Sequence, residues 1–62
     1  MPIVQIEILE GRTVEQKRAI ADKVTKAIME AISCPADAVS IIIRDMPREN
    51  YAKGGVLAAD RK

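Results

Sequence analysis

The chain contains no histidine, tryptophan or phenylalanine, and it has one tyrosine and one cysteine. Cys34 has no second cysteine with which to form a disulfide inside the chain, and without histidine the usual zinc site lacks ligands. The shortage of aromatic side chains removes the platforms on which bases stack, and ten Lys and Arg against nine Asp and Glu form no basic stripe. We therefore expect neither a metal site nor nucleic-acid binding.

Long hydrophobic runs are also missing. No apolar stretch approaches the roughly 20 residues that a membrane-spanning helix needs. The first residues lack the basic region followed by an apolar segment that is typical of a secretory signal. We therefore expect no membrane partner and a cytoplasmic location, with which one unpaired cysteine is compatible.

The length of 62 residues predicts one small domain over residues 1–62. Domains of roughly 60 residues bury only about 60 % of the surface of the unfolded chain, so their stability is marginal. Disulfides, a bound metal or oligomerisation usually add the missing stability. Since the composition excludes the first two, we expect an oligomer.

The hydrophobic pattern predicts a strand, a helix and a second strand. Residues 2–9 and 39–46 alternate apolar and polar side chains with the period of two that a half-buried strand requires. Between them, apolar residues recur over 20–32 at helical spacing. Thr13 and Gln16 have the form of a capping box that opens this helix near Val14, and Pro35 should end it near Ser33.

A strand, a helix and a strand in this order form a βαβ unit with parallel strands. Gly54 and Gly55 signal a turn near the end of the chain, where we expect a short hairpin. The predicted fold class is therefore α+β. The two strands leave both sheet edges unpaired. They also leave a partly apolar face, which carries Ile3, Leu9 and Ile42, without a second layer, so we expect partner subunits to complete the sheet.

Few side chains are suited to catalysis. Cys34 has no base near it in sequence, and we interpret it as a small buried residue at the helix end. Asp45 and Glu49 are interpreted as solvated surface acids. Pro2 is the sharper candidate, because removal of the initiator methionine from a Met-Pro start leaves a free secondary amine.

An α-amino group has a reference pKa of about 7.7–8.0. Cationic neighbours and desolvation would lower the pKa of such an amine toward the neutral range, in which a general base is most efficient. Arg12 lies in the turn after the first strand and could supply positive charge from this or another subunit. Its guanidinium could also clamp a substrate carboxylate through two parallel hydrogen bonds.

Taken together, these residues resemble the 4-oxalocrotonate tautomerase family over essentially the whole chain. The resemblance rests on the segments PIVQI at 2–6, LEGRT at 9–13, EQK at 15–17 and GG at 54–55. It implies a tautomerase-like fold and a hexamer built as a trimer of dimers, in which each dimer forms a four-stranded sheet with two helices on one face.

The resemblance also implies an activity. In the family the amino-terminal proline, here Pro2, is the general base that moves a proton in 2-hydroxydienoates or enolised 2-oxo acids, as in aromatic catabolism. The reaction needs no metal or organic cofactor. We therefore expect a keto-enol tautomerase, an isomerase that acts on a small-molecule enol or 2-oxo acid as a homo-oligomer.

The same resemblance assigns substrate contacts. Arg12 would bind a carboxylate, the backbone around Leu9 would contribute to the pocket, and Tyr51 stands where the family usually has a phenylalanine that keeps the surroundings of the proline apolar. Ser40 stands where the founding members carry a second arginine, and a serine cannot supply that charge. Candidates to replace it through neighbouring subunits are Arg44, Arg48 and Lys53.

Two other functions stay open. Some relatives dehalogenate 3-haloacrylates with an extra acid that activates water, and Asp45 and Glu49 are the acids nearest the end of the second strand. Alternatively, the chain keeps the fold for assembly or ligand binding with little turnover, inside a mixed oligomer. The serine at position 40 favours this last function.

Overall fold

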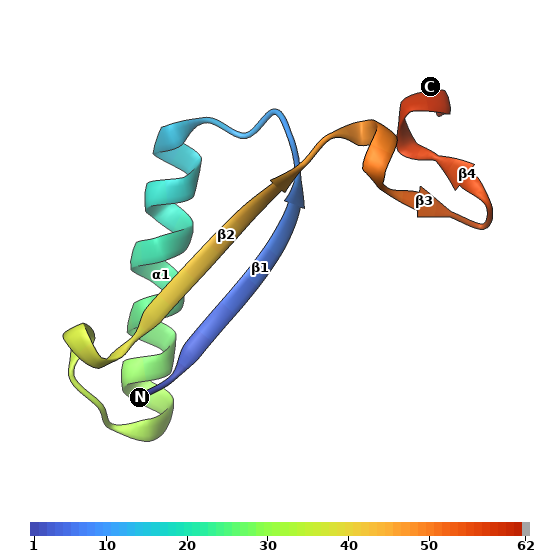
Figure 1. Cartoon of the computed structure of the whole chain (residues 1–62). Helices are drawn as coiled ribbons and strands as arrows, with labels where there is room; N and C mark the ends of the chain where they lie inside the picture. Colours follow the sequence, from blue (N-terminus) through green and yellow to red (C-terminus); the bar gives the residue numbers. More distant parts are fainter. Residues whose placement is uncertain (62) are drawn as a thin grey trace.

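The computed structural model describes residues 1–61 and contains one helix that lies against one face of two long strands, followed by a small hairpin (Figure 1). The main elements are β1 (Ile3–Leu9), α1 (Val14–Ile32), β2 (Ser40–Met46), β3 (Ala52–Lys53) and β4 (Val56–Leu57). Short 3-10 turns cover Ala36–Ala38, Arg48–Asn50 and Ala58–Asp60. The predicted α+β fold with parallel strands and a terminal hairpin is confirmed.

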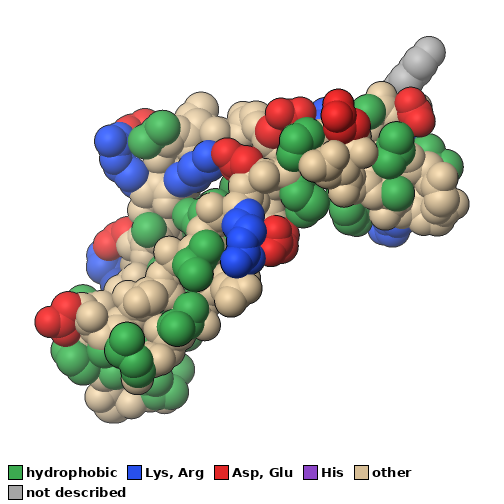
Figure 2. Space-filling model, in the orientation of Figure 1, with side chains coloured by type: hydrophobic (Ala, Val, Ile, Leu, Met, Phe, Trp, Pro, Cys, Tyr) green, Lys and Arg blue, Asp and Glu red, His purple; other side chains and the backbone are tan. Residues whose placement is uncertain are grey.

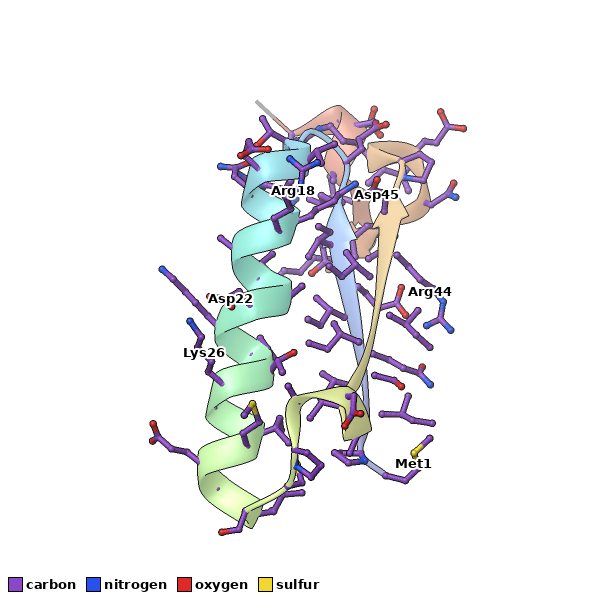
Figure 3. The ribbon with its side chains drawn as sticks, turned by 90° about the vertical axis from the view of Figure 1, so that its left-hand side faces the viewer. Met1, Arg18, Asp22, Lys26, Arg44 and Asp45 are labelled. Atoms are coloured by element: carbon purple, nitrogen blue, oxygen red, sulfur yellow. The ribbon has the colours of Figure 1, made fainter. Side chains whose placement is uncertain are left out.

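The strands β1 and β2 pair in parallel from Ile3 beside Ser40 to Leu9 beside Met46. The alternation places every second side chain toward α1, and the apolar ones among these are half-buried. The helix covers only that face of the sheet (Figures 1 and 3). The opposite face has no second layer from residues 1–61, as the sequence predicts, with Ile3 at 59 % and Ile42 at 40 % exposure.

The ends of α1 follow the sequence signals. Thr13 and Gln16 form the capping box, in which the Thr13 hydroxyl accepts from the Gln16 N–H at 3.1 Å and the Gln16 side chain accepts from the Thr13 N–H at 2.9 Å. The helix ends at Ile32, because Ser33 adopts the left-handed conformation with φ 56° and ψ 50°. Pro35 then excludes further helix. These contacts fix where the chain turns back into β2.

Residues 47–61 form an arm that projects away from the βαβ unit (Figure 1). The arm is held together by its own hydrogen bonds around Ala58, which is 5 % exposed and is the only residue that is buried, rather than half-buried or exposed, in the described part of the chain. The Ala58 N–H donates to the Tyr51 carbonyl at 2.8 Å, and the Arg48 guanidinium donates to the Ala58 carbonyl at 3.0 Å. These hydrogen bonds link the beginning of the arm to the segment after its hairpin.

A single copy has more surface than a compact protein of its size. Its accessible surface is 4823 Å², against about 3950 Å² from the scaling of surface with mass for monomers. Its radius of gyration is 14.6 Å, against about 10.6 Å for a compact domain of this length. The excess of about 900 Å² is comparable to what one partner buries in a stable interface. Within residues 1–61, no helix is both long and apolar enough to cross a membrane.

Candidate functional site

The predicted site residues lie at two opposite ends of the sheet. Pro2 and Ser40 lie at the start of the strands, where the Ser40 N–H donates to the Pro2 carbonyl at 3.0 Å. Leu9 and Arg12 lie at the other end of β1 or just beyond it. Since the seven residues of β1 span roughly 23 Å, one chain does not bring Pro2 to Arg12.

A hollow of about 380 Å³ lies at the end of the sheet where the arm begins, and it is lined by Glu7, Leu9, Met46 and Tyr51. It brings together Leu9 and Tyr51, two of the residues predicted to contact substrate. Glu7 and Met46 were not predicted from the sequence. The signal for them is indirect, because Glu7 shares the strand parity of Leu9, and Met46 is the partner of Leu9 in the register.

The uncovered sheet face is only partly apolar, as the alternation in the sequence predicts. Hydrophobic side chains lie along the strands and over the arm, with acidic and basic side chains between them (Figure 2). In its middle, Arg44 Nη1 donates to Glu7 Oε2 at 2.9 Å and to Gln5 Oε1 at 3.2 Å. Arg44 points away from α1 (Figure 3). A polar cluster thus interrupts the face beside the hollow.

The three candidates to replace the arginine missing at Ser40 differ in their contacts. Arg44 is engaged with Glu7, and the Arg48 guanidinium is engaged with the Ala58 carbonyl. Lys53 is exposed, and among residues 1–61 its amine forms no ion pair. Of the three, therefore, Lys53 alone has a cation without such a contact in the described chain.

Arg12 is presented on a turn that is fixed by backbone contacts. Gly11 has φ 111°, a conformation that glycine adopts without strain. The N–H of Glu10 donates to the Met46 carbonyl at 2.8 Å, and the Glu10 carboxylate accepts from the Arg48 N–H at 3.2 Å. Within residues 1–61 the exposed Arg12 guanidinium has no hydrogen bond or ion pair, which leaves it available to an anion.

The chemistry of Pro2 depends on the residue before it. Met1 is 90 % exposed and Pro2 is half-buried. While Met1 is present, the nitrogen of Pro2 is a tertiary amide without a basic lone pair. A base at this position therefore requires removal of Met1, which has little packing to hold it.

The other titratable residues considered from the sequence do not line the hollow. Asp45 lies on the helix side and pairs with Lys17 at 2.6 Å, and Glu49 is exposed in the turn after β2. Cys34 is half-buried and unpaired, where the sequence interpretation had it buried. No group of three or more potential metal ligands is clustered in residues 1–61.

Comparison with known proteins places this arrangement in a family. The model of the family described as "Tautomerase enzyme" matches residues 2–61. The 2-hydroxymuconate tautomerase of Comamonas testosteroni is 47 % identical over 60 residues, which are 97 % of this chain and 95 % of that protein. The chain belongs to the tautomerase family. This membership, over nearly its full length, supports an isomerase activity.

Solved structures of the tautomerase family have the same fold. A structure from work on the 4-oxalocrotonate tautomerase isozymes of Methylibium petroleiphilum superposes with a TM-score of 0.90 at 52 % identity and covers 94 % of each chain. A chain of a heterohexamer 4-oxalocrotonate tautomerase from Chloroflexus aurantiacus superposes with a TM-score of 0.94 at 32 % identity and covers all of both chains. The resemblance stated from the sequence is thereby confirmed.

Proposed function

We propose that the protein is a cofactor-independent keto-enol tautomerase whose general base is the amine of Pro2 after removal of Met1. The observation that carries the proposal is the match of the tautomerase family to residues 2–61, which includes the position of this proline. The proposed substrates are 2-hydroxydienoates or enolised 2-oxo acids, because a relative at 47 % identity is named for 2-hydroxymuconate. Aromatic catabolism in the cytoplasm is the proposed setting.

The proposed reaction moves one proton within the substrate. The neutral Pro2 amine accepts the proton of the 2-hydroxyl group, and the electron pair of that O–H bond forms the carbonyl. The double bonds shift along the chain, and the protonated amine returns the proton to a distal carbon. The product is a conjugated 2-oxo acid, and the amine is neutral again.

The other site residues bind the substrate and adjust the base. Arg12 offers two parallel N–H donors to a carboxylate. Leu9 and Tyr51 form apolar walls of the hollow. An apolar environment disfavours the charged form of an amine and so lowers its pKa, which keeps more of Pro2 neutral at physiological pH. The Tyr51 hydroxyl can also donate a hydrogen bond to the substrate.

The site is proposed to form between subunits. Pro2 and Arg12 lie at opposite ends of β1, so a substrate that touches both must lie where two chains meet. A single copy has more accessible surface than a compact monomer of its mass, and this excess is large enough for contact with a second chain. We propose a homo-oligomer, specifically a hexamer assembled as a trimer of dimers.

Native mass spectrometry over a dilution series tests the assembly. The expected result is a hexamer at micromolar concentration, with activity falling in step with any dissociation, because dissociation separates Pro2 from the Arg12 of the other chain. A stable, folded monomer, or full activity in a monomeric fraction, would contradict the proposal.

Ser40 favours a second function, that of a weakly active subunit in a mixed oligomer. Serine does not carry the positive charge of the arginine that stands at this position in the founding members. Loss of a charge-assisted hydrogen bond at a desolvated site costs about 1.5–3 kcal/mol. That cost equals one to two orders of magnitude in turnover. An assay of the purified protein with 2-hydroxymuconate and with phenylenolpyruvate separates the functions. Turnover by the homo-oligomer supports the tautomerase, whereas activity only after mixing with a related chain supports the mixed oligomer.

A further inference from the structure

The wall of the hollow contains one charged side chain. Leu9, Met46 and Tyr51 present mainly apolar surface, and Glu7 presents a carboxylate. The substrates proposed above are anions, so a bare carboxylate in this wall would repel them. Glu7 therefore needs a compensating charge if the hollow is to hold such a substrate.

Arg44 provides that charge from the neighbouring strand. Glu7 and Arg44 are direct partners in the register of β1 and β2, and their side chains lie on the same face of the sheet. The Arg44 guanidinium is 2.9 Å from the Glu7 carboxylate and also donates to Gln5. The two side chains are about half exposed, at 49 % and 51 %, so the pair contributes little to stability. The small contribution to stability does not limit the effect of Arg44 on the net charge that a substrate meets in the hollow.

We propose that Arg44 is a specificity-determining residue that neutralises Glu7 in the wall of the hollow and thereby admits anionic enol substrates. The inference rests on the proposed function, because it takes the hollow as part of the substrate site. It assigns Arg44 a role different from replacing the arginine missing at Ser40. Arg44 acts through Glu7 and does not itself bind the substrate carboxylate.

The size of the effect follows from Coulomb's law. Two like charges about 6 Å apart repel enough to weaken binding about threefold at the dielectric constant of water and about tenfold at half that value. Because the Glu7 and Arg44 side chains are both about half exposed, we expect an effect in this range. The repulsion is larger for a substrate with two negative charges than for one with a single charge. It also weakens with salt, because the screening length falls from about 30 Å at 0.01 M to about 10 Å at 0.1 M ionic strength.

The test compares Arg44→Met, Glu7→Gln and the double variant with the parent. At low ionic strength, Arg44→Met should raise KM for the dianion 2-hydroxymuconate about three- to tenfold, and less for the monoanion phenylenolpyruvate, with kcat little changed. Glu7→Gln should lower KM for the dianion. The double variant should return KM close to the parent value, and added salt should reduce the effect of Arg44→Met.

Lys26→Met is the matched control. Lys26 pairs with Asp22 at 3.0 Å on α1, and both lie away from the strands (Figure 3). The change also removes one positive charge and leaves one carboxylate unpaired, but far from the hollow. We expect its KM values to equal those of the parent.

Three results would overturn the inference: a KM for Arg44→Met equal to that of Lys26→Met, a double variant as impaired as Arg44→Met, or an effect that is independent of salt. If Arg44→Met does not assemble, Glu7→Gln alone carries the test, and a raised KM for the dianion contradicts the inference. A parent protein inactive on both acids would instead reject the proposed function, so the two failures are distinguishable.

Discussion

Replacement of Pro2 by alanine is expected to lower kcat/KM for 2-hydroxymuconate by about 10²-fold, at the lower end of the range that a general base contributes. We expect the loss in kcat/KM at the lower end of this range because the processed variant still has an α-amino group. That primary amine rotates freely, whereas the proline ring fixes the direction of the nitrogen lone pair. Steady-state kinetics at several pH values, followed by the absorbance of the dienol, provide the measurement.

Controls for Pro2→Ala concern assembly and processing. Alanine is also small enough for removal of Met1, so intact mass should show the same processing in both proteins. Native mass should show the same oligomer, because Pro2 contributes mainly its backbone carbonyl to the contact with Ser40. Equal rates for the parent and the variant under these conditions would rule out Pro2 as the base.

Replacement of Arg12 by alanine is expected to reduce kcat/KM by about 10- to 150-fold, mostly through KM. The reason is the loss of a charge-assisted bond to the substrate carboxylate, which is worth about 1.5–3 kcal/mol. Stability should change little, since the exposed Arg12 side chain has no hydrogen bond or ion pair within residues 1–61. Arg12→Lys should recover part of the loss, because an ammonium keeps the charge but not the two-pronged geometry.

Lys23→Ala is the matched control for Arg12→Ala, because Lys23 is an exposed cation on α1 whose loss changes the net charge equally. Its kinetic constants should equal those of the parent. An Arg12→Ala protein with the KM of Lys23→Ala would show that Arg12 does not bind the substrate carboxylate.

The sequence predicts the βαβ unit well because its signals are local. The alternation over 2–9 and 39–46 places the strands within one residue of β1 and β2. The capping box at Thr13 fixes the start of the helix. The helix ends at Ile32, next to Ser33 as the sequence predicts, and Ser33 adopts the left-handed conformation. Each of these features depends on neighbours within a few positions.

Features that depend on contacts between distant residues were not predicted. The internal fold of the arm follows from hydrogen bonds that link Arg48 and Tyr51 to Ala58, and no periodic pattern in the sequence predicts these bonds. The cluster of Glu7 and Arg44 depends on the strand register, which the alternation alone does not give. The alternation therefore indicates that the second sheet face is uncovered and carries Glu7 and Arg44, but not that these two side chains form an ion pair.

Only part of the candidate site could be predicted from the sequence, because the rest also depends on contacts between distant residues. Leu9 and Tyr51 meet at the hollow, whereas Pro2 lies at the far end of β1, and only the resemblance to the family joins them in one site. In the proposed assembly two chains share the site, and positions in a single chain cannot reveal such a site. The accessible surface of one copy, which exceeds that of a compact monomer of this mass, supports the proposal that a second chain completes the site.

The most direct test of the central claim compares chains with and without Met1, separated by intact mass and assayed with 2-hydroxymuconate. The two forms have the same side chains in the site and differ in whether the nitrogen of Pro2 is an amine or an amide. The account predicts that activity scales with the processed fraction and is lost in chains that retain Met1. Full activity in a preparation that retains Met1 would show that the Pro2 amine is not the base.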